Sequence, residues 1–347
     1  MPHVPFTRAG VVAPILAELE RCGAPVDHLM AAAGLPACAR VDPEVLIPSM
    51  STARLLAGGA RAQMLDDLGL RAGERARLDD LGIFGDLIRA ARTVRDAVET
   101  AVNEYASFSS DGMLSSRARG GDVELSYVPL DEHAIGPGPR HAEHYFLMLM
   151  LQVVRLGADP TWCPAEVHLR TGGVAVVRAA ESFEGARVSF GRPETMVAIP
   201  AAVLAEPLRS NDAHPRLPQQ IIAAWRRSGP ARDFVESIVH AVETLSWDGY
   251  PDIRRTAVFL GTSVRTLQRH LAAAGISHES LVGRARFATA AAVLEETDMK
   301  LLDIALDLGY SDHAHFTRAF RRWAGCSPQE YRRRHRQQQA GSKPSVA

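Results

Sequence analysis

Apolar residues recur every three to four positions along much of the first 230 residues, which is the spacing of helices that bury one face. The helices predicted from this period span residues 11–21, 50–65, 84–91, 95–108 and 139–156. Thr93 precedes the fourth of these and is its expected N-cap, because a threonine oxygen can accept a hydrogen bond from the first turn. The front of the chain is therefore expected to be rich in helix.

Other parts of the same region alternate apolar and polar residues with the period of two that predicts strands. Val123, Leu125 and Tyr127 show this alternation, and Gly120-Gly121 before them suits a hairpin turn. The predicted strands span residues 113–119, 123–128, 166–169, 187–190 and 196–199. Helices and a small sheet together predict an α+β domain.

A predicted helix over 215–228 ends at Gly229-Pro230, and this turn-forming pair is the expected boundary between two domains, 1–230 and 231–347. A chain of 347 residues is long enough for two domains. Beyond the boundary the sequence shows only helical periods. The helices predicted there span 233–245, 253–260, 264–273, 281–294, 301–308, 314–323 and 328–334. We therefore expect a multidomain protein, with an α+β N-terminal domain followed by an all-α domain.

The all-α domain contains an internal repeat. Residues 256–263 and 304–311 share alanine, leucine, glycine and serine at matching offsets, 48 residues apart. The alanine leaves room for a second helix to cross, the glycine can adopt a positive φ at the turn, and the serine can cap the next helix. This pattern predicts two helix-turn-helix motifs, at about 253–271 and 302–323.

The second helix of each motif has an apolar stripe, expected to pack inward, and a polar opposite face. The stripes are Val264, Leu267 and Leu271 in the first copy, and Phe316, Phe320 and Trp323 in the second. The opposite faces carry Arg265, Thr266, Gln268, Arg269 and His270, and His313, His315, Thr317, Arg318, Arg321 and Arg322. Such side chains can bond base edges or phosphates. One copy alone is also typical of a plain helical hairpin, whereas two basic copies favour DNA binding. A helix over 281–295, about 20 Å long, is the expected spacer between them.

The charge distribution also favours a polyanionic partner. The net charge is −1, but residues 1–230 carry 23 basic and 27 acidic side chains, whereas residues 231–347 carry 16 and 13. From His313 to the end, eight basic residues accompany the single acidic Glu330. A solvated basic tail would explain this cluster alone, but beside two helix-turn-helix motifs it favours nucleic acid.

Several classes of enzyme are excluded by the scarcity of lysine. Of 39 basic residues only Lys300 and Lys343 are lysine, so the first 299 residues offer none for a phosphate-binding loop or a Schiff base. The sequence also lacks the glycine-rich, G-x-S-x-G and H-E-x-x-H motifs. We therefore expect no catalytic residues, no cofactor and no enzymatic activity.

Metal and membrane binding are not expected either. The cysteines, Cys22, Cys38, Cys163 and Cys326, form no C-x-x-C pair and are predicted to be reduced and mostly buried. His141 and His144 lie three residues apart on a predicted helix, but without a third ligand they are expected to be surface or lightly buried side chains. No apolar run approaches the length of a membrane span, and a cytoplasmic location is expected.

The second domain resembles the AraC/XylS family of bacterial transcription regulators over roughly residues 233–334. The resemblance is carried by L-G-T-S-V-R-T-L-Q-R-H-L at 260–271, I-A-L-D-L-G-Y-S-D-H-A-H-F-T-R-A-F-R-R-W at 304–323 and S-P-Q-E-Y-R at 327–332. It implies that Arg265, Gln268 and Arg269, and in the second copy Ala314, His315 and Arg318, occupy DNA-facing positions. Ala314 can offer only apolar contact, for instance to a thymine methyl. The full expected set is Arg265, Thr266, Gln268, Arg269, His313, Ala314, His315, Arg318 and Arg322.

The first domain resembles the ligand-binding domain of a subgroup of the same family, typified by regulators of ornithine and other amino-acid catabolism. The resemblance is carried by A-x-V-x-L-R at 165–170 and by R-V-S-F-G, I-P and P-L within 187–208. It implies that this domain senses a small molecule, whose identity no motif reveals. We expect double-stranded DNA, RNA polymerase and a second copy of the chain as macromolecular partners.

Two alternatives remain at this point. A DNA-repair alkyltransferase with an accessory helix-turn-helix domain would need an activated cysteine, yet neither Cys38 nor Cys163 has a neighbouring histidine or cysteine in the sequence. An architectural DNA-binding protein would not need an acidic domain of about 230 residues. Both alternatives are less favoured than a regulator that senses a small molecule.

Overall fold

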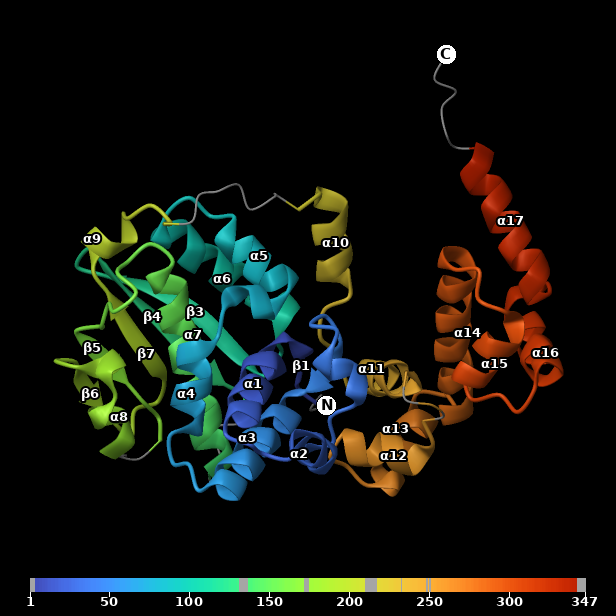
Figure 1. The fold of residues 1–347 in the computed structure, drawn as a ribbon, viewed down its shortest axis with the longest axis horizontal. Coiled ribbons are helices and arrows are strands. Elements are labelled where there is room, and N and C mark those ends of the chain that lie inside the picture. The colour runs from blue at the N-terminus through green and yellow to red at the C-terminus, as the bar shows by residue number, and fades with distance from the viewer. Residues whose placement is uncertain are drawn as a thin grey trace, which may run out of the picture. The chain divides into compact units, whose positions relative to one another are not determined.

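The computed structural model describes residues 4–130, 137–171, 175–209, 217–231, 233–247, 249 and 251–341. The chain divides into two compact units, His3–Arg232 and Asp233–Ala347. The first unit mixes helices with two sheets, and the second is helical throughout its described residues (Figure 1). The predicted fold class, an α+β domain followed by an all-α domain, is confirmed.

The strands of the N-terminal unit form two sheets. They are β1 (Phe6–Arg8), β2 (Leu46–Pro48), β3 (Gly112–Arg119), β4 (Asp122–Pro129), β5 (Glu166–His168), β6 (Arg187–Ser189) and β7 (Thr195–Ile199). β1 and β2 pair antiparallel, and the other five strands form a sheet in the order β3-β4-β7-β5-β6. Among the strands of this larger sheet that the structure describes, β5 and β6 pair parallel and the other neighbours pair antiparallel. The hairpin between β3 and β4 turns at Gly120 and Gly121, both at positive φ, as the sequence predicts.

The helices of this unit surround one continuous apolar core. They are α1 (Ala13–Arg21), α2 (Val26–Ala33), α3 (Ser49–Gln63), α4 (Leu68–Arg75), α5 (Ile83–Arg89), α6 (Val94–Phe108), α7 (Pro137–Arg155), α8 (Ala175–Ala179), α9 (Ala201–Leu204) and α10 (Gln219–Arg227). Thr93 caps α6 as expected, because its oxygen accepts from the backbone N–H of Asp96 at 3.2 Å. The helix predicted from 215 begins only after Pro218, and residues 215 and 216 lie outside the described residues.

Helix α7 is central to the unit and contacts α3, α4, α6 and β7. Two glycines one turn apart bring α4 close to it. A Cβ added at Gly69 would lie 2.1 Å from the carbonyl oxygen of His141, and one at Gly73 would lie 2.4 Å from Cβ of Met148. Only glycine permits so close an approach of two helices.

The expectation of lightly buried histidines is wrong, because α7 buries both of them in this crowded interior. His141 and His144 are 1% and 0% exposed. Both ring nitrogens of His144 and Nδ1 of His141 lack a hydrogen-bond partner among the described residues. Burial lowers the pKa of His144 to about 4, and the charges of His141 and Arg140 act in the same direction. Within the described residues, no group of three His, Cys, Asp or Glu side chains could hold a metal ion.

A buried guanidinium ties the start of the unit to its last helix. Arg8, 2% exposed, donates to the carbonyl oxygens of Trp225 at 2.7 Å and Ser228 at 3.2 Å, at the end of α10. It also forms an ion pair with Glu44 at 3.1 Å, and Glu44 accepts from the indole N–H of Trp225 at 2.7 Å. The guanidinium lies 4.7 Å from the centroid of that indole. This network holds α10 against the body of the unit.

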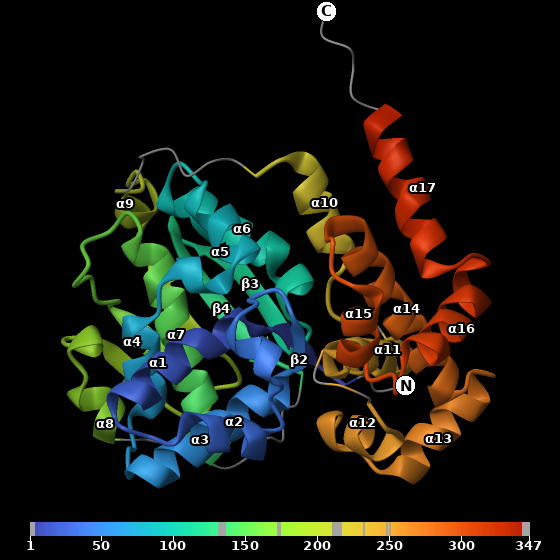
Figure 2. The ribbon, with the colours of Figure 1, turned by 45° about the vertical axis from the view of Figure 1, so that its right-hand side comes forward.

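The C-terminal unit consists of seven helices within its described residues. They are α11 (Phe234–Ser246), α12 (Ile253–Phe259), α13 (Val264–Ala273), α14 (His278–Glu296), α15 (Leu301–Asp307), α16 (His313–Ala324) and α17 (Pro328–Gly341). Within this unit α14 contacts α11 on one side and α16 and α17 on the other (Figure 2). In the described part of the whole chain, no helix is both long and apolar enough to cross a membrane.

The buried histidine makes stability depend on pH. An ordinary histidine has a pKa of 6.5, so below that pH the unfolded chain binds a proton that folded His144 takes up only near pH 4. The free energy of unfolding should therefore fall as the pH falls, by about 2 kcal/mol between pH 7 and pH 5 from this side chain. Urea unfolding at both pH values measures the loss.

His144→Leu removes the titrating group and should lose less stability than the wild type over the same interval. His28→Gln, which changes an exposed histidine, is the matched control and should keep the full pH dependence. Equal pH dependence in the wild type and in His144→Leu would contradict the interpretation.

Candidate DNA-binding site

The first helix-turn-helix motif joins α12 to α13. Asp252 caps α12 by accepting from the N–H of Arg255 at 2.8 Å, and Ser263 caps α13 by accepting from the N–H of Thr266 at 3.1 Å. Between the helices Gly261 has a φ of +64°. Leu267 of α13 is fully buried. The turn glycine and the capping serine are both as predicted.

The second motif joins α15 to α16 and differs from the first by one residue. Gly309 has a φ of +71°, as expected, but the N-cap is Asp312 and not Ser311. The carboxylate of Asp312 accepts from the N–H of His315 at 2.6 Å. The predicted capping serine is therefore wrong in this copy, because the aspartate that follows it is the better placed acceptor at the start of the helix.

This extra residue changes which positions of the two motifs are equivalent. The turn glycines, Gly261 and Gly309, are 48 residues apart, whereas buried Leu267 and Phe316 are 49 apart. Beyond the cap, Arg269 therefore corresponds to Arg318, and Arg265 corresponds to Ala314. The two recognition helices share an arginine at one exposed position and differ at another.

Most of the predicted DNA-binding side chains lie on the exposed surfaces of α13 and α16. Exposed residues of this set are Arg265, Gln268, Arg269, His313, Ala314, His315, Arg318 and Arg322. Thr266 is half-buried, and its hydroxyl bonds to that of Ser263 at 3.0 Å. Each recognition helix thus has an exposed polar face. Thr266 is the exception, because it bonds to the capping residue Ser263.

Two residues expected on these polar faces are turned inward instead. The ring of His270 packs on Phe234 of α11, with 4.2 Å between the ring centroids. The hydroxyl of Thr317 is buried and has no partner among the described residues. Both lie at the edge of an apolar stripe, where helical periodicity alone does not decide between the two faces.

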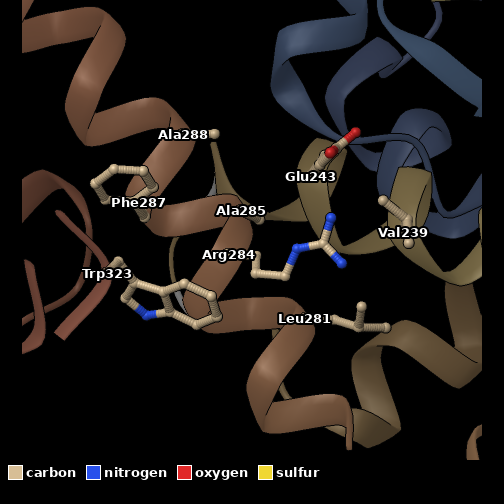
Figure 3. A pocket seen from close by; sticks show the side chains of 8 residues that line it. All are labelled: Val239, Glu243, Leu281, Arg284, Ala285, Phe287, Ala288 and Trp323. Atoms are coloured by element: carbon tan, nitrogen blue, oxygen red, sulfur yellow. The ribbon is translucent and has the colours of Figure 1, made fainter. Parts of the chain in front are cut away.

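Trp323 departs from the expectation that it packs inward, because it is 42% exposed. Its indole lies against Gly283 of α14, where an added Cβ would be 3.0 Å from Cζ2. Beside it is a cavity of about 260 Å³ between α11, α14 and α16. The cavity is lined by Val239, Glu243, Leu281, Arg284, Ala285, Phe287, Ala288 and Trp323 (Figure 3). The apolar stripe of α16 thus ends at the rim of this cavity and not in the core.

Part of the basic cluster near the C-terminus has a structural role. Arg332 of α17 donates to the carbonyl oxygens of Met299 at 2.7 Å and Leu294 at 3.4 Å. Tyr331 donates to Glu295 at 2.8 Å, and Arg334 pairs with Glu330. The contacts of Arg332 and Tyr331 anchor α17 to the end of α14 and the loop after it, whereas the pair of Arg334 and Glu330 lies within α17. Arg332 and Arg334 therefore have partners within the protein, and not all of the positive charge of this cluster is free to bind another molecule.

Sequence reasoning missed Arg286 in the spacer helix. Its Nη2 donates to the carbonyl oxygen of Gly309 at 3.2 Å, in the turn of the second motif. The guanidinium also lies 4.6 Å from the ring centroid of Tyr310. The sequence offers no local signal for this contact, because the partners are more than twenty residues apart and belong to different helices.

The surroundings of the cysteines bear on the alkyltransferase alternative. All four cysteines are free, but only Cys326 is buried, so the expectation of mostly buried thiols is wrong. Cys163, one of the two candidates named for the alkyltransferase alternative, has its Sγ 3.3 Å from the carbonyl oxygens of Thr161 and Glu181. Both oxygens are hydrogen-bond acceptors for the thiol.

Two capped helix-turn-helix motifs joined by one helix define the C-terminal unit as a DNA-binding domain of transcription regulators. Comparison with known families agrees. Residues 256–334 match the family described as a helix-turn-helix domain. Residues 23–208, more than half of the chain, match the arabinose-binding domain of AraC transcription regulators, N-terminal part. The chain belongs to the AraC family of transcription regulators.

Individual relatives are similar over both units. The ornithine utilization regulator of Pseudomonas aeruginosa is 27% identical over 277 residues, which cover 76% of this chain and 78% of that protein. The regulator VirS of Mycobacterium tuberculosis is 28% identical over 286 residues, covering 80% and 82%. The solved transcriptional regulator CdpR of Pseudomonas aeruginosa has a TM-score of 0.42 at 22% identity, covering 89% and 96%. The alkyltransferase alternative receives no support from these comparisons.

The crossing of α15 and α16 can be tested by overpacking. Ala305 is 0% exposed and packs in one cluster with Phe316 and Phe320. Ala305→Leu should lower the free energy of unfolding of the C-terminal unit by about 1–3 kcal/mol, because the added methyl groups have no space. Ala314→Leu, at an exposed position of α16, is the control and should leave urea unfolding nearly unchanged. Equal stability of both variants would show that the crossing lies elsewhere.

Proposed function

We propose that residues 231–347 read a specific DNA sequence and that residues 1–230 bind an effector and a second copy of the chain. The observation that carries this proposal is the pair of recognition helices, each with an exposed polar face and two buried apolar side chains, Leu267 and Leu271 in α13 and Phe316 and Phe320 in α16. The expected contacts are made by Arg265, Thr266, Gln268, Arg269, His313, Ala314, His315, Arg318 and Arg322. Because α14 spans 19 residues, about 28 Å at 1.5 Å per residue, it is long enough to space two helices toward successive major grooves.

The effector is a small molecule, RNA polymerase is the partner in transcription, and the regulator acts in the cytoplasm, where bacterial DNA lies. The family description names arabinose, and one relative is named for ornithine utilization, so both compounds are starting points for a ligand search. The scarcity of lysine and the carbonyl environment of Cys163 support a binding function and not a covalent one.

Base reading is tested by removing one arginine from the first recognition helix. Arg265 and Arg269 are exposed and four residues apart, so at least one should bond O6 and N7 of a guanine. Replacing that arginine by alanine should weaken the binding free energy by about 1–3 kcal/mol on the site that the wild type selects from a random library. The variant should also lose its preference for one base at one position of that site. Arg284→Ala, which removes an exposed arginine from α14, is the charge-matched control. Equal losses on selected and random DNA would contradict direct base reading.

Effector binding is tested by thermal shift of the full-length protein against a metabolite panel that includes arabinose, ornithine and other amino acids. A true effector should raise the melting temperature in proportion to the logarithm of its concentration, because ligand binding to the folded state is linked to stability. It should also change the affinity for the selected DNA site. A compound that shifts melting but leaves DNA affinity unchanged would not be the effector.

A further inference from the structure

The second recognition helix is held from outside its own motif by a side chain of the spacer helix. Arg286 lies in the middle of α14 and reaches the turn between α15 and α16. It donates to the carbonyl oxygen of Gly309 at 3.2 Å and places its guanidinium 4.6 Å from the ring centroid of Tyr310. A charge-assisted hydrogen bond and a cation–π contact together fix the turn better than either alone.

Tyr310, which contacts Arg286, also contacts two residues in the first turn of α16. Its ring lies edge-on to the ring of His315, with centroids 5.5 Å apart and an interplanar angle of 84°. It also lies 5.5 Å from the ring of buried Phe316. Arg286, Tyr310 and His315 therefore form a continuous series of contacts from the spacer helix to an exposed residue of the recognition helix.

The imidazole of His315 has a ring neighbour in Tyr310, whereas the helix cap bonds only the backbone of His315. The carboxylate of Asp312 accepts from the backbone N–H of His315 at 2.6 Å, which fixes the backbone at this position. The Tyr310 ring stands beside the imidazole and restricts the rotamers that it can adopt. A base contact needs a side chain that is already oriented before DNA arrives, since ordering it on binding costs free energy.

The first motif places different residues at the same offsets. The positions 48 residues before Arg286 and Tyr310 are Ile238 and Thr262. Ile238 is fully buried in α11, and the N–H of Thr262 bonds to the carbonyl oxygen of Ala257 at 2.9 Å. Tyr310 makes the equivalent backbone bond to Ala305 at 2.8 Å, so the turn itself is the same in both copies. The stack of Arg286 on Tyr310 is added to that turn in the second copy.

We propose that Arg286 is a positioning residue of the second recognition helix, which orients His315 through Tyr310 for reading a base. This inference rests on the proposed function, because it requires that α16 reads DNA. It assigns to α14 a part in specificity beyond that of a spacer. Arg286 acts through the turn and is not expected to touch the DNA itself.

The test measures the affinity of the full-length protein for its library-selected site and for random DNA. Arg286→Ala should weaken binding to the selected site about tenfold and leave random DNA nearly unchanged, because orientation is lost and charge steering is kept by the other arginines. The loss should be confined to the base pairs protected by the second motif. Arg286→Lys, which keeps a donor to Gly309 and a cation near Tyr310, should recover part of the loss. Arg284→Ala, on the same helix without a polar partner in the described residues, should behave as wild type.

A double-mutant cycle separates positioning from general destabilisation. Tyr310→Leu should give a similar loss, and Arg286→Ala with Tyr310→Leu should be no worse than the stronger single variant. Additive losses, equal losses on selected and random DNA, or losses spread over both half-sites would overturn the inference. Failure of the proposed function is distinguishable, because the wild type itself would then select no sequence from the library.

Discussion

The N-terminal unit depends on one buried cation. Arg8 belongs to the first strand of the chain, yet its guanidinium bonds to carbonyl oxygens at the end of α10, the last helix of the unit. Glu44 neutralises it and also receives the indole N–H of Trp225. A buried charge is tolerated only where it is paired and its donors have hydrogen-bond partners. Removing either Arg8 or Glu44 would therefore leave the other charge without its partner and destabilise the fold. The place where the chain leaves this unit is therefore fixed by contacts made near its beginning.

A single helix has the same organising role in the C-terminal unit. α14 contacts α11 before it and α16 and α17 after it, so both halves of the domain share one support. Small residues lie at some of these contacts, with Gly283 against Trp323 and Ala290 buried, and this lets neighbouring helices approach closely. The longer side chain of Arg286 extends from this helix to the turn of the second motif and donates to the carbonyl oxygen of Gly309. The same helix, α14, therefore packs against the second recognition helix and bonds to the turn that precedes it.

Periodicity in the sequence predicted the long helices and the hairpin strands, because each buries one regular face. For α13 it also predicted the observed bounds. It missed α4, whose Gly69 and Gly73 read as turn residues but allow contact with α7. The three-residue strands β1 and β2 are too short to show alternation. On the polar face of α13, helical spacing correctly predicted the exposed arginines but not His270, which packs on Phe234. Contacts between distant segments, such as Arg8 with α10, leave no local pattern to read.

The unequal caps of the two motifs determine which parts of them are interchangeable. Ser263 and Asp312 are the residues from which the two recognition helices begin, although they do not align when the turns are superimposed by sequence. A recognition helix moved from one motif to the other would keep its buried stripe in phase only if the transplanted segment starts at its own capping residue. A transplant cut by the repeat of the turns would be one residue out of register, which rotates the helix by about 100° and buries its polar face. The capping residue is therefore the position at which each recognition helix can be exchanged as a unit.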